Sequence, residues 1–319
     1  VSVPTVSKVL NGRSGVSTAT RDKVMALLEK HGYSKHARSA SRAAIIDLVL
    51  PGPPNHWSTQ ILDGVRTEAS ILDMDLVVTF ASASADSLDN WLRRVSTRGS
   101  SGVVLVAQEP TGNEVEWIRR LDIPMVAICP PVRTEQQVPV VAASHWAGAR
   151  EAVEHLVMLG HRRIATITGP LSFVDHDERL GAFHSVLSRH GIAVDPQFVL
   201  EGDALFETGV TLGKELLSRK DRPTAILAGS DEQAFGVYSA AHSLGLRVPQ
   251  DISVIGFDNV DVGVWAQPPL TTVHQPLDLI AKESVRLLIG AGSLSDSSQP
   301  RIELPSQLIL RSSTAAPPS

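Results

Sequence analysis

The residue types that could carry catalysis or hold a metal form few suggestive patterns in this sequence. The triplet Asp175-His176-Asp177 contains metal-capable side chains, but its spacing does not place them on one face. A solvated loop, or a polar contact from Asp175 to a ligand, is therefore favoured over a metal site. No Walker-type glycine loop, Gly-x-Ser-x-Gly elbow, His-Glu-x-x-His motif or reactive-cysteine context occurs. We expect a protein that is not an enzyme and that needs no cofactor or metal.

Charge is distributed unevenly along the chain, and the distribution points to a partner. Residues 1–44 contain eight Lys or Arg against only Asp22 and Glu29, whereas the formal net charge of the whole chain is −5. A basic segment on an acidic body is typical of a surface that binds nucleic-acid phosphates. On charge alone, a solvated basic helix pair without a partner is an equally good interpretation.

The basic segment has the pattern of two short helices followed by a linker. Residues 5–12 place apolar side chains at i, i+3 and i+4 and end in an Asn-Gly pair. A second amphipathic run, 18–31, begins after the N-cap candidate Ser17 and ends at Gly32. Residues 34–44 contain Ser, Ala and Arg but no large apolar side chain, which favours a linker. We expect this head to have little core of its own.

From Ile45 onward, short apolar segments alternate with amphipathic segments of helical length. This alternation predicts an α/β fold in which parallel strands are joined by helices. A single sheet with every candidate strand would be unusually wide, so two sheets of comparable size are favoured, with a break near Val140–Ser144. Ligands of open α/β sheets bind beyond the carboxyl ends of the strands, and we expect the site there.

Several ordered stretches make the chain similar to a known family. They are Thr5-Val6-Ser7-Lys8-Val9-Leu10-Asn11-Gly12 in the head, and Leu159-Gly160-His161-Arg162-Arg163-Ile164, Asp251-Ile252-Ser253-Val254-Ile255-Gly256-Phe257-Asp258 and Pro269-Leu270-Thr271-Thr272-Val273 in the body. In order and spacing they resemble the lactose/galactose repressor family of bacterial transcription regulators. The resemblance implies a two-lobed, periplasmic-binding-protein-like (type I) body of two parallel Rossmann-like sheets, with an N-terminal all-α helix-turn-helix head.

The resemblance also suggests domain boundaries. It implies a helix-turn-helix head at 1–33, without the family's first helix, and a hinge or linker at 34–44. The effector-binding domain would span 45–311, with an N-terminal lobe at 45–143 and 276–292 and a C-terminal lobe at 144–275 and 300–311. The remaining residues, 312–319, are rich in Ser, Thr, Ala and Pro and are expected to form a disordered tail.

For the head, the resemblance implies a recognition helix that enters the major groove of DNA. Val3, Pro4 and Lys8 fall at the family's base-reading positions, and Lys8 can donate to guanine O6 and N7. Residues suited to phosphate contacts are Thr5, Ser7, Asn11, Ser17 and Thr20. For any one of these, capping a helix or facing solvent is an equally good interpretation. The linker lacks the family's groove-wedging Leu, although Arg38 and Arg42 can read a narrow minor groove electrostatically.

A sugar presents apolar C–H faces and a ring of hydroxyl groups, so its pocket needs aromatic side chains together with charged or amide groups. By resemblance, Arg179 is the ligand-binding arginine and Asp258 the carboxylate acceptor. Further candidates are Trp57, Trp146, Phe173, Asp175, Phe206, Ser230, Asp231 and Gln275. Arg179 and Asp258 could instead pair with each other, and Asp231 could merely cap a helix. Cys129 stands where some relatives have Asp, so one hydroxyl contact is expected to be absent.

Together these features predict a repressor that binds a near-palindromic operator as a homodimer and responds to a mono- or oligosaccharide bound between its lobes. We expect the sugar to release DNA, and corepression by a purine or another small molecule is the alternative. A periplasmic sugar-binding protein would share the body, but it needs a secretion signal and has no use for a basic head. Since the sequence contains neither such a signal nor a long apolar run, we expect a cytoplasmic protein without membrane contact.

Overall fold

A computed structural model describes most of the body and a few residues of the head. The described residues are 44–81, 85–108, 112–131, 138–290 and 300–318, together with Thr5, Val9, Ser17, Thr20, Lys23 and Val24. The DNA-contact candidates that lie outside the described residues are Val3, Pro4, Ser7, Lys8, Asn11, Arg38 and Arg42. In the described part of the chain, no helix is long and apolar enough to cross a membrane.

The first of two six-stranded sheets forms the centre of the N-terminal lobe. Its strands are all parallel, in the order β11 (Arg301–Leu304), β5 (Val140–Ala143), β4 (Met125–Ile128), β3 (Gly102–Val106), β1 (Ile45–Leu50) and β2 (Asp75–Phe80). β3, β4 and β5 consist of buried apolar residues throughout, as expected for parallel strands with helices on both faces. Asp47 is fully buried among the otherwise apolar residues of β1.

The second six-stranded sheet forms the centre of the C-terminal lobe. Its order is β12 (Gln307–Ile309), β10 (Thr271–His274), β9 (Ser253–Asp258), β8 (Ala225–Ala228), β6 (Ile164–Thr168) and β7 (Val199–Glu201). Neighbouring strands are parallel except β12, which runs antiparallel to β10. The parallel strands direct their carboxyl ends to one edge of the sheet, which is where the sequence predicted the ligand site.

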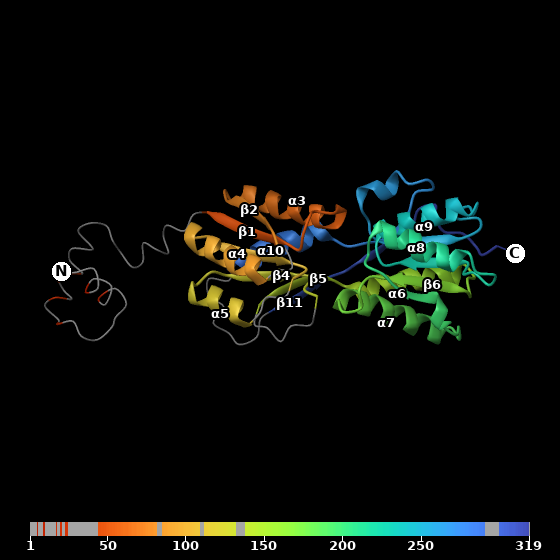
Figure 1. Ribbon diagram of the computed structural model, residues 1–319, viewed down its shortest axis with the longest axis horizontal. Coiled ribbons are helices and arrows are strands. Elements are labelled where there is room, and N and C mark those ends of the chain that lie inside the picture. Colours follow the sequence, from red (N-terminus) through yellow and green to blue (C-terminus); the bar gives the residue numbers. More distant parts are fainter. Residues whose placement is uncertain are drawn as a thin grey trace.

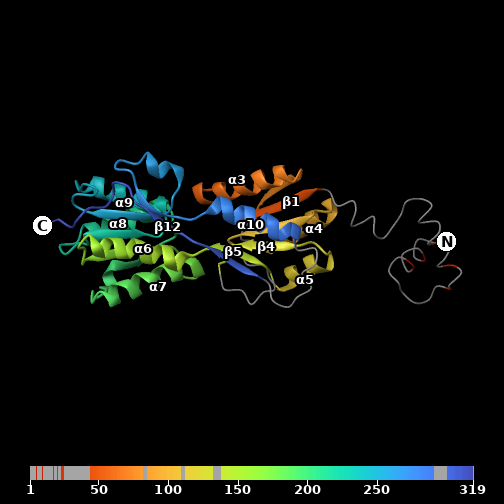
Figure 2. The ribbon, with the colours of Figure 1, turned by 180° about the vertical axis from the view of Figure 1, so that it is seen from behind.

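Helices cover both sheets (Figure 1). The first lobe contains α3 (His56–Ile71), α4 (Ala85–Arg98), α5 (Gly112–Arg120) and α10 (Leu277–Gly290), and the second contains α6 (His145–Met158), α7 (Val174–Arg189), α8 (Phe206–Leu217), α9 (Asp231–Ser243) and the short 3₁₀ helices η1 (Pro196–Phe198) and η2 (Asp261–Val264). Figure 2 shows α10 beside α3. The two helices can approach closely because residue 64 is a glycine without a side chain. A Cβ at this position would come within 2.6 Å of the Ala281 Cβ.

The chain crosses between the lobes after β5, after β10 and after β11. The first crossing follows Ala143, within the predicted break near Val140–Ser144. The two-lobed α/β fold class predicted from the sequence is confirmed by this arrangement.

The predicted assignment of residues 300–311 to the C-terminal lobe was wrong for β11. This strand pairs in parallel with β5 at the edge of the first sheet. Ile302 and Leu304 pack against the core of the first lobe, because alternate residues of the strand face the same side. Only β12 joins the second sheet.

The predicted disordered tail at 312–319 was also wrong for its described residues, 312–318. The buried Ser313 hydroxyl donates to the Val254 carbonyl at 2.6 Å and accepts from the Thr271 backbone N–H at 2.8 Å. The Val254 N–H donates in turn to the Ser313 carbonyl at 2.9 Å. Small hydroxyl residues suggested disorder by composition, but here they satisfy polar groups of β9 and of the residues that begin β10.

Candidate functional site

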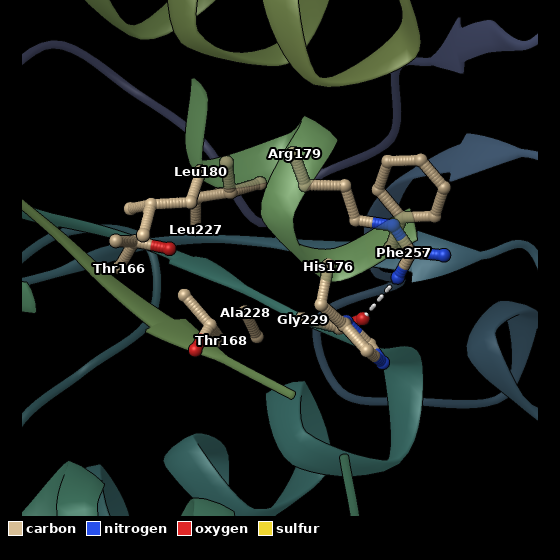
Figure 3. Close-up of a pocket in the computed structure, with 9 residues that line it drawn as sticks. All are labelled: Thr166, Thr168, His176, Arg179, Leu180, Leu227, Ala228, Gly229 and Phe257. Carbon is tan, nitrogen blue, oxygen red and sulfur yellow. Dashed lines mark hydrogen bonds between the residues drawn. The ribbon is translucent and has the colours of Figure 1, made fainter. Parts of the chain in front are cut away.

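Arg179 lies in a buried polar cluster at the carboxyl edge of the second sheet. It is part of α7, which follows β6. Its Nη1 donates to the Gly229 carbonyl at 2.5 Å, and its Nη2 lies 3.1 Å from His145 Nδ1 and 3.5 Å from Asp175 Oδ2. The guanidinium carbon is 3.7 Å from the centre of the Phe257 ring, a cation–π contact (Figure 3). We refer to these five residues as the Arg179 cluster.

His145 is a neutral member of the cluster. It begins α6, and its ring stacks on that of Phe257 with the centroids 6.1 Å apart. Burial, followed by the charge of Arg179, lowers the pKa of His145 to about 3, so the ring is uncharged at neutral pH. Its Nε2 atom is buried and has no hydrogen-bond partner among the described residues.

Asp258 ends β9 and pairs with Gln275. Gln275 Nε2 donates to Asp258 Oδ1 at 2.6 Å. The hydrogen-bond partner of Asp258 is therefore Gln275 and not Arg179, which was the predicted alternative. Burial raises the pKa of Asp258 well above its usual value, and the nearby charge of Arg179 opposes this shift. The backbone of Asp258 has a φ of 127°, a conformation that L-residues rarely adopt. Gln275 Oε1 is buried and unpaired within the described structure.

Ser230 and Asp231, which follow β8, both have structural contacts. Ser230 caps α9, since its Oγ accepts from the backbone N–H of Gln233 at 3.0 Å. Asp231 is fully buried and accepts from the backbone N–H of Val260 at 2.8 Å and from the Thr272 hydroxyl. The cap considered for Asp231 is therefore supplied by Ser230, and Asp231 fixes the segment after β9 against β10. Burial raises the pKa of Asp231 to about 6.

The four aromatic candidates are placed differently. Phe173 precedes α7 and meets the His176 ring edge-on, with the centroids 6.3 Å apart, so it lies beside the Arg179 cluster. Trp57 is half-buried in the first turn of α3 and packs against the core of the first lobe. Trp146 and Phe206 lie in the first turns of α6 and α8, each 40% exposed. For Trp57, Trp146 and Phe206, contact with a ligand stays a prediction.

A small cavity lies next to Arg179, between α7 and the second sheet (Figure 3). It is lined by Thr166, Thr168, His176, Arg179, Leu180, Leu227, Ala228, Gly229 and Phe257. Its volume of about 10 Å³ is near the minimum for one water molecule. Burial lowers the pKa of His176 to about 4, and its Nδ1 has no partner in the described part of the chain.

Unpaired buried polar atoms therefore gather at this edge. They include Arg179 Nε, His145 Nε2, His176 Nδ1 and Gln275 Oε1. Leaving one buried polar atom unpaired costs about 1–3 kcal/mol, and native proteins rarely leave several together without a reason. The arrangement can bind a small polar molecule that supplies the missing hydrogen-bond partners.

The remaining chemistry-bearing residues near the site have limited roles. No group of three metal-capable side chains gathers anywhere in the described residues. Burial alone would raise the pKa of Asp175, but the charges of His176 and Arg179 outweigh it and lower this pKa. Asp175 Oδ2 lies 3.5 Å from Arg179 Nη2. Cys129 follows β4, and burial raises its thiol pKa to about 12, so it is a neutral group at this edge of the first lobe.

The two lobes meet beside the Arg179 cluster. The backbone N–H of Val174, the first residue of α7, donates to the carbonyl of Pro131 at 2.7 Å. Pro131 follows β4 of the first lobe. The polar edge of the second sheet is therefore in direct contact with the first lobe.

Comparison with known proteins decides the family. Residues 1–36 match the model for bacterial regulatory proteins of the lacI family, and residues 153–314 match that for the periplasmic binding protein-like domain. The whole chain is 30% identical to the HTH-type transcriptional repressor CytR of Escherichia coli K12 and covers 94% of it. The chain belongs to the LacI family. Within this family it is similar over both head and body to two solved structures.

One of these LacI-family structures is the complex of the transcriptional regulator CelR with cellobiose. It is 29% identical, the match covers 98% of this chain and 96% of CelR, and the TM-score is 0.77. The other is a lac repressor dimer bound to operator and the anti-inducer ONPF. The repressor is 29% identical, the match covers 99% of this chain and 96% of the repressor chain, and the TM-score is 0.76.

The described residues of the LacI-family head agree with the predicted helix start. The Thr20 backbone N–H donates to Ser17 Oγ at 3.3 Å, and the two hydroxyls lie 2.8 Å apart, so Ser17 is the N-cap. Val9 and Val24 are 5% and 2% exposed, so these two apolar side chains, one from each predicted helical run, are buried. Phosphate contacts by Thr5, Ser17 and Thr20 stay predictions.

Three residues of this LacI-family site were missed by sequence reasoning. His145 follows β5, and its position directly after a strand was the signal that could have found it. Phe257 lies in a strongly apolar strand, and that pattern does not distinguish it from a core residue. His176 was weighed only as a metal ligand, because its contact with Arg179 and the sheet depends on the helix packing.

Proposed function

We propose that this LacI-family protein is a transcriptional repressor that binds operator DNA as a homodimer and whose operator affinity is controlled by a small carbohydrate. The observation that carries the proposal is the gathering of buried, unpaired hydrogen-bonding atoms around Arg179. The proposed effector residues are Asp175, Arg179, Asp258 and Gln275 with Phe173 beside them, and the secondary candidates are Trp57, Trp146, Phe206, Ser230 and Asp231.

The chemistry of the cluster favours an uncharged ligand with several hydroxyl groups. The charge of Arg179 already faces Asp175 and the Gly229 carbonyl, which leaves little to attract an anion. The unpaired atoms include both donors and an acceptor, and a hydroxyl group can serve as either. The cellobiose bound to the similar regulator CelR supports the same ligand class.

The position of the cluster suggests how a ligand acts on DNA binding. The Arg179 cluster borders the contact between the lobes, where Val174 meets Pro131. A ligand that binds here favours one relative position of the lobes. In a homodimer this changes the spacing of the two heads and hence the operator affinity. We expect induction, in which the sugar releases the operator.

For the head we propose the domain boundaries and contacts that the sequence suggested. The helix-turn-helix head spans 1–33 and the linker 34–44. Bases are read by Val3, Pro4 and Lys8, phosphates are bound by Thr5, Ser7, Asn11, Ser17 and Thr20, and the minor groove is approached by Arg38 and Arg42. The protein acts in the cytoplasm, on the bacterial chromosome, and is not an enzyme.

A thermal-shift screen tests the effector. The panel contains D-ribose, D-glucose, D-galactose, cellobiose and the purine bases, added to the full chain. We expect a sugar to raise Tm, because a ligand that binds only the folded state stabilises it. Arg179→Met should abolish this shift, whereas Arg162→Ala, at an exposed position before β6, should preserve it. A Tm raised by a purine and by no sugar would reject the carbohydrate and favour corepression.

A gel-retardation assay tests the DNA activity. A full-length protein should retard a fragment from upstream of its own gene cluster, and the sugar found in the screen should weaken that binding. Lys8→Ala should lower affinity for this fragment more than for unrelated DNA, because only a base contact carries sequence information. Equal retardation of all fragments would contradict sequence-specific repression.

A further inference from the structure

His145 stands at a crossing between the lobes. It directly follows Ser144, whose backbone N–H donates to the Leu304 carbonyl at the end of β11 at 2.8 Å. Its side chain is only 2% exposed and stacks on Phe257 in the second sheet. The imidazole is therefore anchored in the second lobe, while its backbone lies at the joint between the lobes.

The contact with Arg179 determines which ring nitrogen of His145 carries the proton. A guanidinium can donate a hydrogen bond but cannot accept one, so Arg179 Nη2 donates to His145 Nδ1 over 3.1 Å. In the neutral ring the proton is then on Nε2, which makes this atom a donor. Nε2 is buried and has no acceptor among the residues that the structure describes. The fold thus presents an oriented N–H group without a partner.

The surroundings of His145 keep it in this state. Burial is the largest cause of its lowered pKa of about 3, the charges of Arg179, His176 and Arg301 act in the same direction, and Asp175 opposes them. The ring therefore stays neutral at physiological pH. Nδ1 remains available to Arg179, and Nε2 remains protonated.

We propose that His145 is a specificity residue of the effector site and that its Nε2–H donates a hydrogen bond to a hydroxyl or carbonyl oxygen of an uncharged effector. The inference rests on the proposed function and names a ligand contact that the resemblance to the family did not supply. A ligand with an N–H donor or a cationic group at this point is rejected, because two donors would face each other. Since His145 follows the crossing, the same bond fastens the effector to the joint between the lobes.

The test compares His145→Asn with the wild type and with His242→Asn, an exposed position near the end of α9. Asn keeps an oxygen near the place of Nδ1, which can accept from Arg179, but has no atom at the place of Nε2. The ligand is whichever of D-ribose, D-glucose, D-galactose and cellobiose raises the wild-type Tm most, titrated by calorimetry into the full chain. We expect affinity to fall about tenfold in His145→Asn and to stay unchanged in the control.

Monodeoxy analogues of that sugar identify the bonded oxygen. With the wild type, one analogue should bind about tenfold more weakly than the parent sugar. With His145→Asn the same analogue should show no further loss, because the bond is already absent. The proposal would be overturned by unchanged affinity of His145→Asn for the parent sugar. It would also be overturned if every analogue lost as much affinity with His145→Asn as with the wild type.

A measurement on the wild type separates this inference from the proposed function. If no sugar of the panel raises Tm, the proposed carbohydrate function fails, and the protonated Nε2 on which the His145 inference depends is judged separately by ¹⁵N NMR of the ring between pH 5 and 8. If His145→Asn does not fold, the same NMR measurement on the wild type replaces the binding test. A proton on Nε2 throughout this range supports the inference. A proton on Nδ1, or titration within the range, rejects it.

Discussion

Each lobe pairs an arginine with an aspartate, but the two groups differ in how many buried atoms lack a hydrogen-bond partner. In the first lobe, both carboxylate oxygens of Asp47 are occupied, one by Arg98 and the other by the Ser100 hydroxyl. Of this group, one atom, Arg98 Nε, is unpaired in the described structure. Around Arg179 in the second lobe, unpaired atoms are found on four residues, Arg179, His145, His176 and Gln275.

The difference teaches that buried charge alone does not mark a binding site. Asp47 lies in the middle of β1 with its partners already present, so it stabilises one lobe. The residues around Arg179 lie near strand ends and helix starts, at the carboxyl edge of the second sheet. Incomplete hydrogen bonding, rather than burial, is the feature on which the proposed effector site rests.

The largest effect is expected from breaking the pair Asp47–Arg98. Asp47→Ala should lower the free energy of unfolding by about 3 kcal/mol, because Ser100 and Arg98 lose a fully buried partner. Sugar affinity should not change, since the pair lies outside the Arg179 cluster. Denaturant unfolding and calorimetry measure the two quantities. Asp63→Ala is the control, because the ion pair of Asp63 with Arg66 is exposed and should contribute little. A tenfold loss of sugar affinity in Asp47→Ala would break the comparison.

Acidification should act through the second lobe. The pKa values of His145 and His176 are lowered to about 3 and about 4 in the folded state, so between pH 7 and 5 the unfolded chain takes up protons on them and the folded protein does not. Stability is therefore full above about pH 6.5 and falls as the pH drops, by about 2 kcal/mol at pH 5 for each histidine. Asp231, whose pKa is raised to about 6, and Asp258, whose pKa is raised well above its usual value, act in the opposite direction.

Unfolding by urea at pH 7 and pH 5 measures this dependence. His176→Asn should reduce the loss between the two pH values, and His242→Asn, at an exposed position, should not. An equal loss in the wild type and in His176→Asn would show that the buried histidines do not cause the acid sensitivity.

A smaller effect is expected from the pair Asp258–Gln275. Gln275→Leu removes the donor to Asp258 and the unpaired Oε1 together. The free energy of unfolding should fall by about 1–2 kcal/mol and sugar affinity by about tenfold. The exposed Gln250 provides the control variant Gln250→Leu. Loss of stability with unchanged affinity would assign Gln275 a structural role, like that of Asp47.

The smallest effect concerns Cys129 at the edge of the first lobe. Burial raises its pKa to about 12, so iodoacetamide at pH 8 should alkylate it far more slowly in the folded protein than in urea. Cys129→Ala should change sugar affinity less than about twofold, because a neutral thiol is at most a weak donor. Rapid alkylation of the folded protein would show that this edge opens to solvent.

Much of the fold could be predicted from alternation along the chain. Strands such as Gly102–Val106 and Ile164–Thr168 are short apolar runs between amphipathic helices, and their positions were clear. Residues 301–304 were assigned to the wrong lobe because a four-residue edge strand carries no information about which sheet it joins. The fixed positions of Ser313 and its neighbours depend on hydrogen bonds to distant strands.

The site could be predicted only in part, for a related reason. Arg179 and Asp258 were found through family spacing, and the structure places both at the carboxyl edge of the second sheet. Asp231 could not be distinguished from a helix cap, because its partners Val260 and Thr272 are remote in sequence. His145 was missed because Val140–Ala143 was interpreted as a break rather than as a strand.

The late position of β11 and β12 has a consequence for synthesis. Each sheet receives an edge strand from this short segment, and Ser313 then joins β9 to Thr271, the first residue of β10. Before residues 301–309 have been translated, both sheets lack this edge strand, and each leaves a strand edge unpaired and open to aggregation. Both lobes therefore depend on this one short segment, and a chain truncated before it would leave both sheets without an edge strand.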